Sequence, residues 1–409
     1  MKLAIVTAYP PSKVTLNEYA YHLVKHFRQN TEISELILLT DIDAKEAEIN
    51  FEEQGCKVTI KPCWKFNSYS NVISVMKAVR QISPDAILFN LQFMKFGDKK
   101  VPAALGLLLP WFCKIKKIPT IVLLHNIMEQ VDLQSAGFTK NKVLQKIYQL
   151  IGTSLTKLIL KADTVAVTIS KYVTILEEKY IANNVTLIPH GTFELPSKPS
   201  YEVNEGPLKV MTFGKFGTYK KVEILIEAVE KIRSRTDANI EIVIAGTDNP
   251  NVSGYLKSME EKYAAVPQLT FTGYVAEEDV PKIFGESAVV VFPYTSTTGS
   301  SGVLHQAGSY GKAVVMPDLG DLSILVKEEG YKGEFFNPQS MESLADGIEK
   351  IILDSSYSAE LGQANYKAAT AYPMSRITQM YIDAFKEISK PNIVDFQKAN
   401  TVFITKKSF

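Results

Sequence analysis

The sequence has few cysteines, almost no net charge and no compositionally biased tract, and each absence argues against a class of protein. Cys56, Cys63 and Cys113 are odd in number and include no CxxC pair, so neither a disulfide framework nor a zinc site is predicted. A net charge of +1 argues against a dedicated nucleic-acid-binding protein. No HExxH motif or nucleophile–His–Asp pattern stands out, so we expect no bound metal ion.

Long apolar runs are also missing. Residues 3–7 are apolar for too short a stretch to form a secretory signal, and no stretch of the chain is long enough to span a bilayer. Unpaired cysteines suit a reducing compartment. We therefore expect a cytoplasmic protein.

What is present is the composition of a soluble globular enzyme. The 409 residues are 46% hydrophobic and 22% charged, and they exceed what one hydrophobic core usually serves. Residues 1–194 contain 23 Lys and Arg against 17 Asp and Glu, a net of +6, whereas the remainder contains 22 against 27, a net of −5. Two domains are therefore expected, and the first is the basic one.

Short β-branched runs alternate with amphipathic segments, which is the pattern of parallel strands joined by crossover helices. A polar stretch with prolines at 194–207 interrupts this rhythm and is interpreted as a linker. We expect an N-terminal α/β domain at 1–195, a C-terminal α/β domain at 206–372, and a helix and tail at 373–409 that cross back to the first domain. The expected strands are 3–7, 35–40, 86–91, 120–124, 164–168 and 185–188 in the first half, and 208–213, 240–245, 269–272, 288–292 and 313–316 in the second.

A loop with glycines and two lysines follows the expected strand at 208–213. It contains Gly214, Lys215 and Lys220 and leads into a helix from Val222. Exposed amides, a helix N-terminus and two ammonium groups suit a diphosphate, and a solvated basic turn is the alternative. The spacing is not that of a Walker loop. The apolar residues on one face of the helix are Leu225, Ile226, Val229 and Ile232.

A second loop, rich in Gly, Ser and Thr, follows the strand at 288–292. Such a loop lets a ligand approach the backbone, and a flexible loop without function is the less favoured alternative. Its amides and hydroxyls come from Gly299, Ser300, Ser301 and Gly302, and His305 and Gln306 follow on the first helical turn.

Two histidines end expected strands of the first half, His125 and His190. A single histidine is more often structural than catalytic, but a position at the carboxyl end of a strand favours a role for His125. The pair Asp41 and Asp43 is interpreted as the surface end of a strand.

Several landmarks then fall in order along the chain: Tyr9-Pro10-Pro11, His125-Asn126, Ala162-Asp163 leading to Ser170, Ile188-Pro189-His190-Gly191, Phe213-Gly214-Lys215 with Lys220, Thr272-Gly273-Tyr274-Val275, and Phe292-Pro293 before the Gly/Ser loop. Over nearly the whole chain they resemble the retaining GT-B glycosyltransferases of family 4. This resemblance implies two Rossmann-like α/β domains that face each other across a cleft.

The resemblance also implies roles for individual residues. Lys215 and Lys220 match the basic pair that grips the donor diphosphate, and His125 matches the histidine near the donor sugar. The implied donor-binding set is Gly214, Gly273, Tyr274, Val275, Thr298, Gly299, Ser300, Ser301, Gly302, Val303, His305 and Gln306, and the acceptor-side set is Lys13, Thr15 and Asn126.

The chain departs from the family pattern at three places. Thr298 and Gln306 stand where the family has two glutamates, so charge-assisted hydrogen bonds to the sugar and ribose are lost. Lys215 stands where the family usually has arginine, which replaces a bidentate phosphate contact by a point charge. Val14 and Thr15 replace a Gly-Gly pair that lies close to the diphosphate.

The implied reaction transfers a sugar with retention, and without a metal cofactor, from a nucleotide-diphosphate sugar to an acceptor hydroxyl, in cell-envelope or exopolysaccharide synthesis. Alternatives are a catalytically silent nucleotide-sugar-binding protein, or a nucleotide-sugar epimerase on the same fold; length disfavours a glycan phosphorylase. The acceptor would be a glycan or a lipid-linked glycan, and no nucleic-acid partner is expected.

Residues 95–117 combine lysines with a strongly apolar run. Such a segment suits peripheral contact with a membrane, which would place the protein at the inner face of the membrane. A buried crossover helix with lysines at its ends is the favoured alternative.

Overall fold

The structure is a computed structural model that describes residues 1–12, 14–43, 49, 51, 53–130, 142–196, 199, 201, 206–249, 252–297 and 300–390. The chain divides into two compact units. The first consists of Met1–Leu123, Leu158–Ala166 and the residues from Thr378 onward, and the second of Leu124–Lys157 and Val167–Ile377.

The N-terminal half forms a seven-stranded sheet in the order β3-β2-β1-β4-β5-β6-β7. The central strands β1 and β4 are buried along almost their whole length, as expected for parallel strands covered on both faces. The strand bounds are β1 Lys2–Val6, β2 Glu35–Asp41, β3 Lys57–Trp64, β4 Ala86–Leu91, β5 Thr120–Leu124, β6 Thr164–Val167 and β7 Val185–Leu187.

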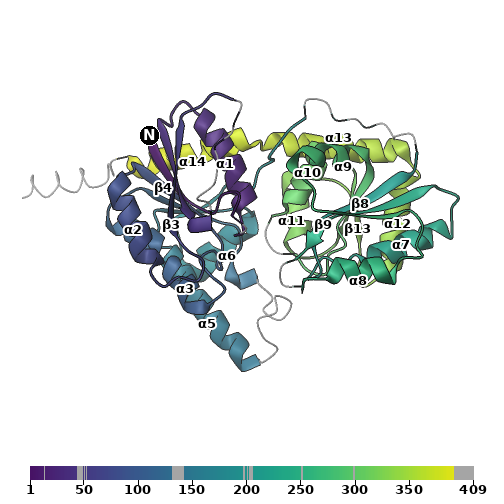
Figure 1. Cartoon of the computed structure of the whole chain (residues 1–409), viewed down its shortest axis with the longest axis horizontal. Coiled ribbons are helices and arrows are strands. Elements are labelled where there is room, and N and C mark those ends of the chain that lie inside the picture. Colours follow the sequence, from purple (N-terminus) through teal and green to yellow (C-terminus); the bar gives the residue numbers. More distant parts are fainter. Residues whose placement is uncertain are drawn as a thin grey trace, which may run out of the picture. The chain divides into compact units, whose positions relative to one another are not determined.

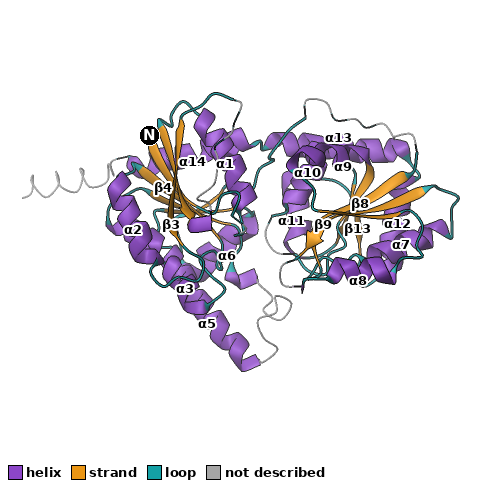
Figure 2. Ribbon diagram, viewed as in Figure 1, coloured by secondary structure: helices purple, strands orange, loops and turns teal. Residues whose placement is uncertain are grey.

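Helices flank this sheet (Figures 1 and 2). The last helix, α14, returns to α1: Tyr381 packs against Phe27, and Lys386 pairs with Glu32 at 2.6 Å. The helices are α1 Asn17–Gln29, α2 Asn71–Ile82, α3 Lys100–Gly106, α4 Leu109–Ile115, α5 Lys142–Ile159, α6 Ser170–Tyr180 and α14 Met374–Ser389, with a 3-10 turn at Met128–Gln130.

The C-terminal half forms a six-stranded sheet in the order β10-β9-β8-β11-β12-β13, in which each neighbouring pair runs parallel. Its strands are β8 Leu208–Phe216, β9 Ile240–Asp248, β10 Leu269–Gly273, β11 Ser287–Val291, β12 Val314–Pro317 and β13 Glu334–Phe336. Its helices are α7 Glu223–Arg233, α8 Tyr255–Lys262, α9 Val280–Glu286, α10 Gly302–Ser309, α11 Gly320–Glu329, α12 Met341–Ile352 and α13 Ser355–Ala371, with a 3-10 turn at Glu277–Asp279.

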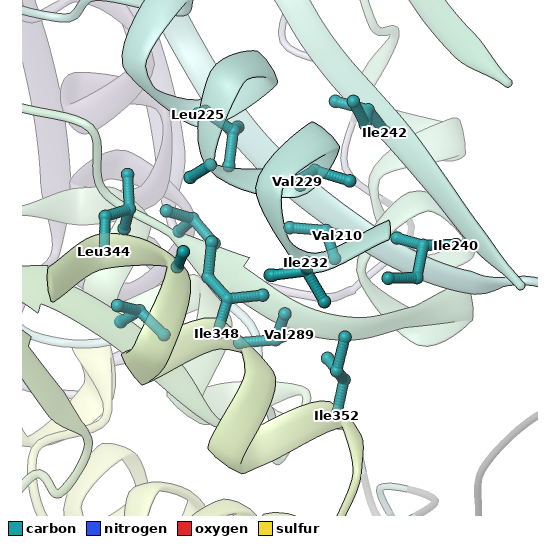
Figure 3. Packing of buried hydrophobic residues seen from close by; sticks show 14 of the residues in the cluster. Val210, Leu225, Val229, Ile232, Ile240, Ile242, Val289, Leu344, Ile348 and Ile352 are labelled. Carbon is teal, nitrogen blue, oxygen red and sulfur yellow. The ribbon is translucent and has the colours of Figure 1, made fainter. Parts of the chain in front are cut away.

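The core of the second sheet lies beneath α7 and α12 (Figure 3). The predicted apolar face of α7 is fully buried there against Val210, Ile242 and Val289 of the strands, and Ile348 of α12 packs into the same cluster. Burial of each such side chain contributes about 1.5–3 kcal/mol. This packing holds β8 and β11, whose loops carry the candidate site, in fixed positions.

The two predicted parallel α/β sheets are confirmed, with two strands that the sequence did not reveal. Strand β3 lies at the edge of its sheet, where its β-branched residues Val58, Thr59 and Ile60 are only half-buried and Pro62 follows them. Strand β13 has three residues, too few to show alternation. The interpretation of Asp41 as a surface residue was wrong: the side chain is buried and accepts a hydrogen bond from Ser12 Oγ at 2.7 Å.

Residues 95–117 form two short helices, α3 and α4, rather than one. Pro102, Ala103, Leu109 and Cys113 are buried, so the apolar run packs largely inward, as in the crossover alternative. Within the described residues, no helix has the length and hydropathy needed to cross a membrane.

Two glycines set the end of β8. Gly214 and Gly246 face each other in the β8–β9 ladder, both with positive φ, of 136° and 138°. A Cβ on Gly246 would lie 1.9 Å from the carbonyl oxygen of Gly214. Only glycine allows this approach, and it fixes the backbone immediately before Lys215.

We therefore expect Gly246→Ala to destabilise the protein by about 2–5 kcal/mol, through the strained φ and the clash with a backbone oxygen. Gly285→Ala is the matched control, because a Cβ on this helical glycine meets nothing within 4 Å. Urea unfolding followed by circular dichroism measures both; equal midpoints for the two variants would contradict the role of Gly246.

Candidate functional site

The candidate site lies at the carboxyl ends of β8 and β11, where the loops after both strands meet. Lys220 and Tyr294 form an antiparallel bridge between these loops. Two further backbone hydrogen bonds, from Lys221 N to Pro293 O at 3.0 Å and from Thr295 N to Tyr219 O at 2.8 Å, hold the loops together. This is where open α/β sheets bind ligands.

A pocket of about 160 Å³ opens between these loops and the start of α10. It brings together five of the predicted donor-site residues: Lys220, Ser300, Ser301, Gly302 and Val303. Tyr219, Tyr294, Thr297 and Leu322, which the sequence did not single out, complete the lining.

Lys220 is the positively charged side chain that lines this pocket. Its Nζ lies 4.7 Å from the ring centroid of Tyr294 and also lies beside Gly214, whose positive φ favours glycine. Burial of the ammonium group, and then the nearby charge of Lys215, lower the pKa of Lys220 to about 8. Lys215 itself is exposed at the end of β8. A nearby anion would stabilise both charges.

The N-terminus of α10 forms the opposite wall. Ser301 is the N-cap, and its side chain accepts a hydrogen bond from the backbone N–H of Leu304. The amides of this first turn and the helix dipole favour an anion.

His305 lies behind this turn and is buried. Its Nε2 is 3.0 Å from Ser300 Oγ and its Nδ1 is 2.8 Å from the hydroxyl of Tyr331. Burial lowers the pKa of His305 well below its usual value, and His190 adds to this effect. Because one ring nitrogen of a neutral imidazole donates and the other accepts, His305 can hydrogen-bond both hydroxyls without carrying charge.

Glu329 stands beside His305, with Oε2 3.6 Å from Nδ1. Burial, and then Glu328, raise the pKa of Glu329 to about 8, so this carboxyl holds its proton at neutral pH. The contact between Glu329 and His305 therefore joins two neutral groups and is not a salt bridge. No sequence pattern pointed to Glu329, because its environment comes from the packing of α11.

Three histidines of the second unit lie in series. The rings of His190 and His305 are parallel, with centroids 5.1 Å apart, and His125 meets His190 edge-on at 6.2 Å. His125 follows β5 as predicted, and the buried Oδ1 of the adjacent Asn126 has no hydrogen-bond partner among the described residues. The Oδ1 of Asn126, beside His125, is therefore available to accept a hydrogen bond from a polar ligand.

Other predicted residues lie apart from this pocket or outside the described residues. Tyr274 and Val275 line a separate pocket of about 300 Å³ beside β10, next to Gly273. Gln306 is half-buried on α10. Lys13, Thr298 and Gly299 are outside the described residues.

Thr15 lies in a loop of the first unit that two side chains hold by hydrogen bonds. Lys95, which is fully buried, donates to the carbonyl oxygen of Thr15 at 2.7 Å, and Gln92 donates to the Thr15 hydroxyl. Burial lowers the pKa of Lys95 to about 7, opposed by the charge of Asp41. In the part of the chain that the structure describes, no group of three or more His, Cys, Asp or Glu residues could hold a metal ion.

The buried carboxyl of Glu329 predicts a pH-dependent cost to stability. Unfolded glutamate ionises near pH 4.5 and the folded group near pH 8, so the folded state retains a proton that the unfolded state releases. Stability therefore falls as pH rises between these values, by at most about 1.4 kcal/mol per pH unit. We expect the melting temperature of Glu329→Gln to exceed that of wild type by an amount that grows from pH 5 to pH 8 and does not increase further above pH 8.

Thermal unfolding of the two proteins at matched pH measures this difference. Glu360→Gln, at an exposed carboxylate, controls for the loss of one charge. A melting-temperature difference that does not change with pH would contradict the neutral state of Glu329.

Comparison with known proteins agrees with this architecture. Residues 195–368 match the family model described as glycosyl transferases group 1. No curated protein matches the sequence.

Solved structures with the same fold have low sequence identity. Anabaena Alr3699/HepE in complex with UDP has a TM-score of 0.67 at 17% identity, over 95% of this chain and 100% of that one. Sucrose-phosphate synthase from Thermosynechococcus elongatus has a TM-score of 0.67 at 14% identity, over 94% of this chain and 98% of that one. A glycosyltransferase from Rickettsia africae has a TM-score of 0.67 at 12% identity, over 96% of this chain and 99% of that one. The chain therefore has the GT-B fold, and its residues 195–368 are similar to the group 1 glycosyl transferases.

Proposed function

We propose that the chain transfers a sugar, with retention and without a metal cofactor, from a nucleotide-diphosphate sugar to the hydroxyl of a glycan or lipid-linked acceptor. The observation that carries this proposal is the pocket that sets Lys220 opposite the N-terminus of α10. Similarity to Anabaena Alr3699/HepE, solved with UDP and with UDP-glucose, supports a uridine nucleotide as the first donor to test. We assign the reaction to cell-envelope or exopolysaccharide synthesis, in the cytoplasm at the inner face of the membrane.

In the proposed reaction the bond between the anomeric carbon and the diphosphate breaks, and the diphosphate leaves with the bonding electrons. Lys220, Lys215 and the amides of α10 stabilise the charge that develops on it, which typically contributes several kcal/mol. The acceptor oxygen forms the new bond on the same face of the sugar, and its proton passes to the departing phosphate. No carboxylate nucleophile is assigned.

A catalytically silent nucleotide-sugar-binding protein is the second candidate, favoured by Thr298 and Gln306 where the family pattern has glutamates. Thermal-shift screening against nucleotides and nucleotide sugars identifies the donor, because a ligand that binds the folded state raises the melting temperature. Release of nucleoside diphosphate from the donor, with and without acceptor glycans, then separates the candidates. Donor binding without any turnover would favour the silent protein, and no shift with any nucleotide would contradict both.

Replacing Lys220 should weaken diphosphate binding selectively. Loss of a charge-assisted hydrogen bond costs about 1.5–3 kcal/mol, so Lys220→Ala should raise the Kd for UDP about 10- to 100-fold, and Lys215→Ala less, because Lys215 is exposed. Lys257→Ala on α8 removes an exposed charge and serves as control. Unchanged affinity in both pocket variants would contradict the phosphate assignment.

The same contact predicts a pH dependence. Since the pKa of Lys220 is lowered to about 8, the protonated form that attracts the diphosphate is lost as pH rises above 8. UDP affinity measured by calorimetry should fall up to about tenfold per pH unit above this value, and Lys220→Arg should remove the fall, because a guanidinium stays charged. The same pH profile in wild type and Lys220→Arg would assign the titration to another group.

His125 should affect turnover more than binding. Its position at the end of β5 beside Asn126 suits contact with the reacting sugar rather than with the diphosphate. His125→Ala should therefore lower kcat by about 100-fold or more while the Kd for UDP stays within about threefold. Steady-state kinetics with the donor found by screening measures the first, and calorimetry the second; an equal loss of UDP affinity would contradict this role.

A further inference from the structure

Helix α5 has more exposed large hydrophobic side chains than any other helix among the described residues. Five of its large hydrophobic side chains are between 39% and 68% exposed, whereas no other described helix contributes more than one to the exposed set. We call them the α5 stripe: Val143, Leu144, Ile147, Leu150 and Ile151.

The stripe is one face of the helix. At about 100° per residue these five side chains fall within an arc of about 120°. The residues of α5 that are buried, Gly152, Thr156 and Ile159, lie on the opposite side, where a Cβ on Gly152 would meet Met128. An amphipathic helix normally turns its apolar face to the core, but α5 turns this one to solvent.

Lysines border the stripe on one side. The helix itself contains no aspartate or glutamate. Lys146 and Lys157, both exposed, lie on α5 along one border of the stripe. An apolar face bordered by lysines matches the boundary between the acyl chains and the phosphates of an anionic bilayer.

A second copy of the chain fits this surface less well. A stable dimer buries roughly 800 Å² per partner, which is more than a stripe of five side chains on two to three helical turns offers. A symmetric pair of stripes would also bring the lysines of both copies together with no acidic side chain on α5 to balance them.

We propose that α5 docks the protein on the surface of an anionic phospholipid bilayer, with the α5 stripe among the upper acyl chains and Lys146 and Lys157 at the lipid phosphates. This extends the proposed membrane-face location and places the contact on α5 rather than on residues 95–117, whose apolar side chains are largely buried. It does not require that the chain transfer sugar.

Flotation of the full chain with vesicles tests this contact. Vesicles of phosphatidylcholine with an equal part of phosphatidylglycerol should bind the wild-type protein, and pure phosphatidylcholine vesicles should bind it at least tenfold less. Ile147→Glu with Leu150→Glu should lower binding at least tenfold, and Lys146→Glu with Lys157→Glu should do so without altering the stripe. Ile73→Glu, at a hydrophobic residue of α2 that is 74% exposed, is the matched control and should bind as wild type.

Melting temperatures and UDP binding of each variant establish that it is folded, and they report on the proposed function separately from the vesicle assay. Three results would overturn the docking proposal. They are no binding of wild type to the anionic vesicles, wild-type binding to pure phosphatidylcholine vesicles that equals its binding to anionic ones, or binding of both double variants that equals that of wild type. A concentration-dependent dimer that is lost in Ile147→Glu with Leu150→Glu, without vesicle binding, would assign the stripe to a second copy instead.

Discussion

Parallel pairing of β8 with β11 is the constraint on which the candidate site depends. Parallel strands end at the same edge of a sheet, so the loops after β8 and β11 meet although about 70 residues separate them. Burial of α7 and α12 against these strands stabilises the pairing. The glycine pair Gly214 and Gly246 then sets the backbone at the point where β8 leads into the basic loop.

The chemistry of the site follows from this edge. Lys220 packs against Tyr294, and burial lowers its pKa. An anionic ligand would therefore stabilise the protonated form of this lysine. Across the pocket, α10 begins with its N-cap Ser301. Behind it, neutral His305 contacts Ser300, and Glu329, which is also neutral, contacts His305. The pocket therefore presents positive charge on one side and uncharged groups on the other.

In the first unit, side chains hold the loop at Val14 and Thr15, the two positions where the family pattern has glycines. Buried Lys95 and Gln92 hold this loop through the carbonyl and hydroxyl oxygens of Thr15. Asp41 is buried next to it and accepts from Ser12. Side-chain hydrogen bonds therefore fix a loop whose backbone lacks the freedom that glycines would give.

The sequence by itself determined the two sheets, nearly all their strands, and the loops with Lys220 and Ser300–Val303 that line the pocket, because alternation of apolar runs and glycine-rich turns is local information. Tertiary structure alone decided that Tyr294 packs against Lys220, that Glu329 faces His305, that Asp41 is buried, and that the α5 stripe faces solvent. Each of these depends on which distant segments become neighbours, and both pKa values and exposure follow from that neighbourhood. Periodicity identifies an apolar face but does not determine what covers it.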